Sequence, residues 1–285
     1  MALVVNPRAG RGRAARLVES VRVALGPGAD VLVGSSGAES VALAREAVAG
    51  GVDAVVAMGG DGLVHCVVQA VSGTGVPLGI VPAGGGNDLA GAFGIPADPR
   101  RAVEVVAAGR TREIDLGRTD SGTWWAGVLN AGFDSQVVAR AERMRHPPGS
   151  TRYDLAAYVE ILHLRHHRMR ITLDGVTTEQ PVTLVAVGNS PRYGGGMHIA
   201  PGARLDDGVF EVVVADALSR ATLVRLKPLV RAGTHVRHPR VHVHRAAAVT
   251  LDAPDLPAYA DGESLGVLPV TTTCVRGAMR VLVPA

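Results

Sequence analysis

The sequence predicts an α/β protein in two parts: a parallel sheet with crossover helices over residues 1–117, then antiparallel sheet with inserted helices over 118–285. The chain has 285 residues and is 47% hydrophobic, which is enough for two cores. Up to about residue 113, short apolar runs alternate with segments of helical periodicity. Beyond that point, alternating runs are joined by turn sequences such as TDSGT at 119–123, as in antiparallel sheets.

The expected strands of the first part are short apolar runs, each ending in a glycine-bearing loop that leads into a helix. They cover residues 2–5, 30–33, 53–58 and 77–81. The helix after residue 60 carries its apolar side chains on one face, namely Leu63, Val64, Val67, Val68 and Val71. In the second part, helices are expected over residues 134–145, 153–164 and 219–232, the last with a kink at Pro228.

Charge and composition argue against a nucleic-acid binder. The chain has 29 basic and 26 acidic residues, and only 3% of its residues are aromatic, so no basic stripe with interleaved aromatics is expected. Lys227 is the single lysine. Any phosphate ligand is therefore expected to be an arginine or a backbone amide.

The chain shows no sign of export or of a membrane span. Cys66 and Cys274 are too few for a disulfide framework or a zinc site, which predicts a reducing compartment. The first residues form no signal peptide, and no run of about eighteen uncharged apolar residues occurs. A cytoplasmic location, with at most peripheral membrane attachment, is expected.

Residues 59–62, GGDG, lie between an apolar strand and a helix, where backbone amides can meet an anion. Glycines allow a ligand to approach closely, and Asp61 puts a carboxylate where phosphates would lie. Because a carboxylate repels phosphates unless a cation intervenes, the turn predicts Mg²⁺ together with a nucleotide. The alternative is a tight turn whose aspartate caps the helix.

Two further loops have the same character. Residues 80–90 pass through three glycines to Asn87 and Asp88, and residues 6–13 contain three arginines. Neither loop is a Walker A sequence or a G-x-G-x-x-G fingerprint. Asp88 is expected to cap a helix and not to bind a ligand.

Six motifs occur in the order found in the diacylglycerol kinase catalytic family, which includes bacterial diacylglycerol and related lipid kinases and the sphingosine and ceramide kinases. They are NPRAGRG (6–12), GGDGLVH (59–65), PAGGGNDLA (82–90), NAGFD (130–134), GGGMHIAPGARLDDGVFEV (194–212) and ADGE (260–263). The chain resembles this family over nearly its whole length. The resemblance implies a three-layer α/β nucleotide-binding domain over 1–117 and an antiparallel β-sandwich domain with inserted helices over 118–285.

By the same resemblance, one set of residues would line the ATP phosphates. It comprises Asn6, Gly59, Gly60, Asp61, Gly62, Leu63, Val64, His65, Gly84, Gly85 and Asn87. Glu263 would be the general base that takes the proton of the lipid hydroxyl, and Asp61 would organise Mg²⁺ and the phosphates. Without the family, an Asp-Gly hairpin turn is the simpler interpretation of residues 260–263.

A structural Mg²⁺ is also implied, held by the Asp207 side chain and by the backbone carbonyls of Arg204 and Val209. A surface turn is the alternative. The sequence departs from the family at Gly85, where threonine or serine is usual, so a hydroxyl ligand for the nucleotide is missing.

Two histidine-rich tracts, 163–170 and 235–244, have metal-like spacing but lack a carboxylate or cysteine to complete a site. We interpret them as solvated basic faces, with contact to anionic lipid headgroups as the alternative.

The resemblance therefore implies an ATP- and Mg²⁺-dependent lipid kinase that phosphorylates a hydroxyl of a diacylglycerol-like lipid at a membrane surface. A sphingoid base or ceramide is the alternative acceptor. The rival functions are an NAD kinase, which shares GGDG, and a nucleotide-binding protein without activity, suggested by Gly85. Exposed sandwich edges would permit a homodimer.

Overall fold

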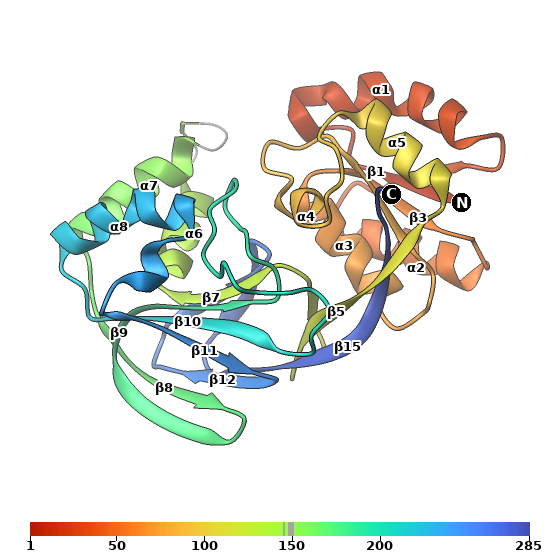
Figure 1. Ribbon diagram of the computed structural model, residues 1–285. Helices are drawn as coiled ribbons and strands as arrows, with labels where there is room; N and C mark the ends of the chain where they lie inside the picture. Colours follow the sequence, from red (N-terminus) through yellow and green to blue (C-terminus); the bar gives the residue numbers. More distant parts are fainter. Residues whose placement is uncertain (145, 148–150) are drawn as a thin grey trace. The chain divides into compact units, whose positions relative to one another are not determined.

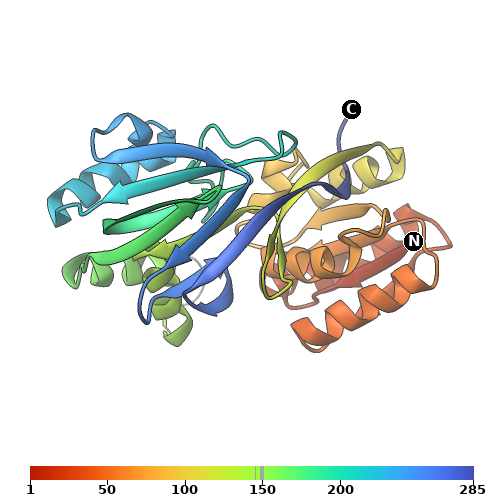
Figure 2. The ribbon, with the colours of Figure 1, turned by 90° about the horizontal axis from the view of Figure 1, so that it is seen from below.

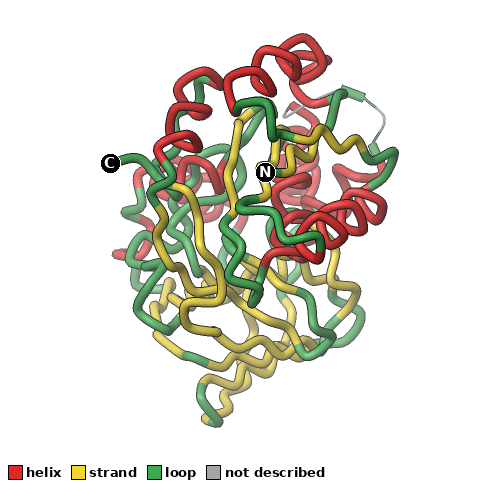
Figure 3. Tube along the Cα trace, turned by 90° about the vertical axis from the view of Figure 1, so that its right-hand side faces the viewer, coloured by secondary structure: helices red, strands yellow, loops and turns green. Residues whose placement is uncertain are grey.

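The computed structural model describes residues 1–144, 146–147 and 151–285, which form two compact units. Unit 1 contains Met1–Leu116, Thr123–Ala126 and Val275–Ala285, and unit 2 contains Gly117–Gly122 and Gly127–Cys274. The sequence pattern assigned the last residues to the second part. They lie in unit 1 because Val281 of the last strand pairs with Leu78, so both chain ends belong to unit 1 (Figures 1 and 3).

The sheet of unit 1 is built from parallel strands in the order β4-β3-β1-β2, with one end of β15 beside β4. The strands are β1 (Ala2–Val5), β2 (Asp30–Val33), β3 (Val55–Gly59), β4 (Leu78–Pro82) and β15 (Val270–Leu282). All residues of β1, β3 and β4 are buried, as expected for central parallel strands covered on both faces. The four predicted strands are present at nearly their predicted positions.

Two layers of helices enclose this sheet (Figure 1). α1 (Ala9–Leu25) and α5 (Pro99–Ala108) cover one face, where Leu3 and Val5 pack with Ala14 and Val103. α2 (Gly37–Ala49) and α3 (Asp61–Val71) cover the other, and the short α4 (Asp88–Ala92) follows β4. The three-layer α/β prediction for the first part is confirmed.

Unit 2 is built on antiparallel strands (Figure 2). The long β9 (Val176–Gly188) serves two layers: its first half pairs with β8, and its second half pairs with β7 and β10. One layer is β11-β10-β9-β7-β13-β14, and the other continues through β8, β12 and β15. The strands not yet bounded are β5 (Thr111–Thr119), β6 (Trp124–Trp125), β7 (Val128–Gly132), β8 (His167–Leu173), β10 (Phe210–Asp216), β11 (Val241–Ala246), β12 (Ala248–Asp252), β13 (Pro257–Ala260) and β14 (Glu263–Val267).

Three helices are inserted into the second part, as predicted: α6 (Phe133–Arg143), α7 (Thr151–Leu162) and α8 (Arg220–Ala232). They pack against one face of the β7–β9–β10 layer through a core that includes Phe133, Ala186 and Val213. Residue 145, the end of the first predicted helix, lies outside the described residues. α8 continues through Pro228, followed by a short 3₁₀ turn, η1 (His235–Arg237). Within the described ranges, no helix is long and apolar enough to cross a membrane.

Candidate active site

Three loops of unit 1 meet where β1, β3 and β4 end, because the carboxyl ends of parallel strands share one edge of the sheet. The N–H of Asn6 donates to the carbonyl of Met58 at 3.1 Å, and the N–H of Gly84 donates to the carbonyl of Gly59 at 3.2 Å. These bonds bring the predicted loops 6–13, 59–62 and 82–90 together.

Glycine is required where these loops touch. A Cβ added to Gly84 would lie 2.5 Å from the Cα of Gly60, and one added to Gly10 would lie 2.2 Å from the carbonyl oxygen of Ala83. Gly10 also has a left-handed backbone, with φ of +59°. Any side chain at these positions would push the loops apart. At the tip of the third loop, Gly85 and Gly86 are exposed, so the loop presents bare backbone to solvent.

Asp61 ties the second loop to the third. Its carboxylate accepts the N–H of Asn87 at 2.8 Å and the N–H of Leu89 at 3.2 Å, which joins the first residue of α3 to the start of α4. A Cβ on Gly86 would lie 2.9 Å from this carboxylate. Asp61 therefore fixes the loop geometry, and its part in binding Mg²⁺ stays a prediction.

The two asparagines of the predicted site brace its loops. Asn87 has a left-handed backbone with φ of +57°, and its side chain both accepts from the N–H of Gly84 at 3.0 Å and donates to the Gly84 carbonyl at 3.1 Å. The Asn6 side chain accepts from the N–H of Arg8 at 3.1 Å. Both amides hold backbone in place, as turn asparagines commonly do.

Three other predicted residues point into the protein. The side chains of Leu63, Val64 and His65 are buried. The ring of His65 lies 3.3 Å from the Gln69 amide nitrogen, which also donates to the carbonyl of Trp124 at 2.6 Å. The residues of the predicted set that reach the surface are Asn6 and Gly85, which are exposed, and Gly60, Asp61, Gly62, Gly84 and Asn87, which are partly exposed.

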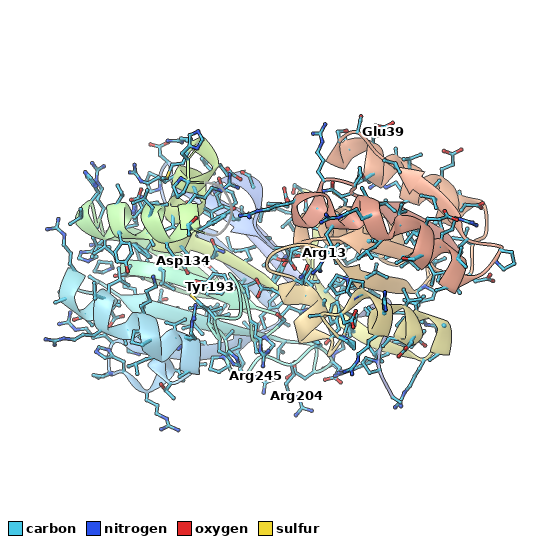
Figure 4. The ribbon with its side chains drawn as sticks, turned by 90° about the horizontal axis from the view of Figure 1, so that it is seen from above. Arg13, Glu39, Asp134, Tyr193, Arg204 and Arg245 are labelled. Carbon is cyan, nitrogen blue, oxygen red and sulfur yellow. The ribbon has the colours of Figure 1, made fainter. Side chains whose placement is uncertain are left out.

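Arg13, which follows the non-helical residues 10–12 at the start of α1, bonds to the end of β4. Arg13 is half-buried, and one of its terminal nitrogens donates to the carbonyl of Pro82 at 3.2 Å (Figure 4). Its Nε is buried and makes no hydrogen bond within the described part of the chain. Because buried donors are normally satisfied, Arg13 is a candidate for contact with a phosphate oxygen.

Glu263 lies in unit 2, at the start of β14. The two residues before it, Asp261 and Gly262, have φ of +54° and +85°, which is the backbone of a two-residue hairpin turn. The Asp261 carboxylate accepts the N–H of Gly127 at 2.7 Å, so the turn is anchored to the residue before β7. Glu263 itself is exposed. The hairpin interpretation is therefore correct, and it leaves the Glu263 carboxylate accessible.

The structure also reveals a carboxylate that the sequence did not single out. The hydroxyl of Tyr193 donates to Asp134 at the start of α6 (Figure 4). Burial raises the pKa of Asp134 to about 6, although the tyrosine bond acts in the opposite direction. A carboxyl group that titrates this close to neutrality is characteristic of functional sites. The NAGFD motif contains Asp134, but only the fold brings Tyr193 to it.

We expect Asp134→Asn to stabilise the protein at pH 7.5 and to leave its stability unchanged near pH 4. The folded pKa lies above the value of 3.8 for an ordinary aspartate, so the folded state binds the proton more tightly, and stability falls as pH rises through about 4 to 6. The asparagine removes this penalty, which amounts to up to about 3 kcal/mol. Urea unfolding at both pH values measures it. Tyr193→Phe should lower the free energy of unfolding at pH 7.5, because it removes the hydrogen bond to the Asp134 carboxylate. Equal stability of the wild type and Asp134→Asn at pH 7.5 would contradict a raised pKa for Asp134.

The predicted structural Mg²⁺ site already contains a cation. The guanidinium of Arg245, which is labelled in Figure 4, pairs with the Asp207 carboxylate. The other oxygen of this carboxylate is 3.4 Å from the backbone nitrogen of Val209. Arg204 directs its side chain toward Asp206, with 4.0 Å between Nε and Oδ1. A metal ion at Asp207 would have to displace Arg245, so the residues present fit this ion poorly.

The histidine tracts form hydrogen bonds with the protein. His166 lies 2.8 Å from the carbonyl of Leu218, and His242 lies 3.0 Å from a carboxylate oxygen of Asp216. Among the described residues, no group of three histidine, cysteine, aspartate or glutamate side chains is placed to hold a metal ion.

Comparison with known proteins identifies the family. Residues 1–119 match the diacylglycerol kinase catalytic domain, and residues 127–283 match the YegS C-terminal NAD kinase beta sandwich-like domain. A diacylglycerol kinase of Mycobacterium tuberculosis (strain CDC 1551 / Oshkosh) is 41% identical over 292 residues, covering 99% of this chain and 94% of the relative. A diacylglycerol kinase of Staphylococcus aureus (strain JH9) is 27% identical over 221 residues, covering 76% and 70%.

Solved structures share the fold. A structure from Bacillus anthracis str. Sterne described as a diacylglycerol kinase has a TM-score of 0.75 at 18% identity and covers 99% of this chain and 96% of that one. A second structure from the same strain has a TM-score of 0.83 at 20% identity, with coverage of 99% and 94%. With both domains matched along nearly the whole sequence, the chain belongs to the diacylglycerol kinase family of lipid kinases.

Proposed function

We propose that the protein transfers the γ-phosphoryl group of ATP, with Mg²⁺, to a hydroxyl of a diacylglycerol-like lipid. The observation that carries the proposal is the cluster of glycine loops held together by Asp61. Exposed backbone at Gly85 and Gly86 lets phosphate oxygens come close, and Arg13 supplies a cation at the same loops. Mg²⁺ bound near Asp61 would neutralise phosphate charge.

Glu263 has the chemistry of the base in this reaction. As the lipid hydroxyl oxygen attacks the γ-phosphorus, its proton passes to the Glu263 carboxylate, and the bond from the γ-phosphorus to the β,γ-bridging oxygen breaks to release ADP. The carboxylate is exposed on an anchored hairpin, so a substrate hydroxyl can reach it. Positioning and charge neutralisation by the glycine loops supply the rest of the catalysis.

Gly85→Ser is expected to fold normally and to bind MgATP up to about tenfold more tightly, because it adds a hydroxyl donor that can reach a charged phosphate. A Cβ at Gly85 would have no other atom within 4 Å, so the residue fits without strain. Gly85→Ala adds the same Cβ without the hydroxyl and is the matched control. Calorimetric titration with MgATP compares the two variants, and equal affinities for Ser and Ala would show that no hydroxyl ligand belongs there.

The acceptor is identified by phosphate transfer from labelled ATP to mixed micelles that each contain one lipid: diacylglycerol, monoacylglycerol, a sphingoid base or ceramide. We expect diacylglycerol to be labelled fastest. Faster labelling of the sphingoid base or ceramide would reassign the acceptor while leaving the lipid kinase proposal in place. Bound MgATP with no labelled lipid in any tube would contradict the proposal.

A further inference from the structure

Helix α7 carries large apolar side chains on its outward face. Leu155, Tyr158 and Leu162 follow one another at intervals of three and four residues, so they form one stripe along the helix. They are 43%, 57% and 67% exposed. The inward face packs on the core of unit 2 through Ala156, which is fully buried, and through Ala157 and Ile161, which are partly buried. The buried Glu160 forms an ion pair with Arg140 of α6.

α7 therefore carries apolar side chains on its outward face as well as its inward one, whereas a surface helix usually turns polar groups to water. The ion pair between Glu160 and Arg140 fixes which face of α7 is turned inward. The outward stripe is therefore a property of the fold and not of one loosely placed side chain. Contiguous exposed apolar surface of this kind marks a contact with another apolar phase.

Helix α8 adds positive charge to the same region. Arg220, Arg225, Lys227 and Arg231 are all exposed, and the helix contains no acidic residue. Val224 and Leu229 are exposed beside them, and Leu223 and Leu226 face the core. Basic residues interleaved with exposed aliphatic ones are typical of helices that lie in a membrane interface.

The exposed sides of α7 and α8 form one surface. The Nζ of Lys227 lies 3.2 Å from a carboxylate oxygen of Asp154 and 5.0 Å from the centre of the Tyr158 ring. One α8 side chain thus contacts two α7 side chains, and the helices lie side by side in unit 2 (Figure 1). Arg220, Val224 and Arg231 lie on the same side of α8 as Lys227 and are exposed. We call this surface the α7–α8 face and define it by Leu155, Tyr158, Leu162, Arg220, Val224, Lys227 and Arg231.

We propose that the α7–α8 face docks the enzyme on a bilayer that contains anionic lipids. The apolar stripe matches the acyl boundary, and the cations of α8 match anionic headgroups, as in interfacial helices. The inference rests on the proposed function, in which the acceptor is a lipid. A second copy of the chain is a poorer occupant, because a two-fold contact would bring the α8 cations of both copies together.

Vesicle sedimentation without nucleotide tests the proposal directly. The wild type should bind vesicles of phosphatidylcholine mixed with phosphatidylserine more tightly than vesicles of phosphatidylcholine alone, and added salt should weaken that binding. Tyr158→Ser with Leu162→Ser should weaken binding by about tenfold or more. Arg220→Gln with Arg231→Gln should lose about twentyfold on the anionic vesicles. Val176→Ser, a 70% exposed aliphatic residue of β9, is the control and should bind like the wild type.

Kinase activity is measured separately with a short-chain diacylglycerol dispersed in detergent, where no bilayer is needed. All four proteins should then turn over alike, because none of these substitutions touches the loops or Glu263. If no protein phosphorylates lipid but vesicle binding still depends on the face, the proposed function fails and the docking surface stands. Unchanged vesicle binding by both double variants would overturn the docking proposal. So would a wild-type dimer that the Tyr158→Ser/Leu162→Ser variant dissociates, since the face would then join two copies.

Discussion

Glu263→Gln is expected to slow phosphoryl transfer by about a hundredfold to ten-thousandfold while MgATP binding persists. Glutamine keeps the size of the side chain but cannot take the proton of the lipid hydroxyl. The fold should not change, because Glu263 is exposed and the hairpin is anchored through Asp261. Turnover with diacylglycerol micelles and calorimetric titration with MgATP together measure the effect.

Glu179→Gln is the matched control for Glu263→Gln, because Glu179 is an exposed glutamate on β9 of the same unit. It should turn over like the wild type. Unchanged turnover by Glu263→Gln would remove Glu263 as the base.

Asp61→Ala is expected to abolish measurable MgATP binding and to lower the free energy of unfolding by about 2–4 kcal/mol. The substitution leaves the N–H groups of Asn87 and Leu89 without their acceptor, at 2.8 Å and 3.2 Å in the native protein. The loop at Gly84–Asn87 then loses its connection to α3. Thermal unfolding reports the stability, and calorimetry reports the nucleotide binding.

Asp61→Asn separates the structural role of Asp61 from its charge. Asparagine keeps one oxygen that can accept a backbone N–H, so it should recover part of the stability, but it lacks the negative charge expected to attract Mg²⁺. We expect this variant to fold well and to bind ATP with a weakened dependence on Mg²⁺. Wild-type Mg²⁺ dependence in Asp61→Asn would show that the carboxylate acts only as a loop brace.

The parts of the fold that follow from local patterns were predictable. Strands β1, β3 and β4 are continuous apolar runs because both faces of a central parallel strand are buried. A loop that contains glycine follows each of these strands. The same rule brings loops 59–62 and 82–90 to one edge of the sheet. The sequence therefore indicates that these two loops lie together.

Contacts between residues far apart in the chain could not be predicted from local sequence patterns. The C-terminal strand joins unit 1 through Val281 and Leu78, which are separated by most of the chain. Arg245 neutralises Asp207 across a gap of 38 residues, and Tyr193 reaches Asp134 across 59. Such partners are set by tertiary register. The resemblance therefore implied a metal at Asp207 without indicating Arg245, and the sequence did not single out Asp134.

The motifs also included residues whose side chains do not reach the surface of the candidate site. The resemblance placed Leu63, Val64 and His65 beside the ATP phosphates, but helical geometry turns their side chains into the core. Asp61 and Asn87 were predicted to face the ligand, and their hydrogen bonds show that they also build the loops that a nucleotide would meet. A sequence motif identifies residues near a site, but it does not show which of them contact the ligand and which only hold the loops in place.

The most direct test of the central claim is phosphate transfer from labelled ATP to diacylglycerol micelles, with and without Mg²⁺, beside a tube in which NAD replaces the lipid. We predict labelled phosphatidic acid that requires Mg²⁺ and no label on NAD. Label on NAD alone, or bound ATP with no labelled product in either tube, would contradict the account of this protein as an ATP- and Mg²⁺-dependent lipid kinase.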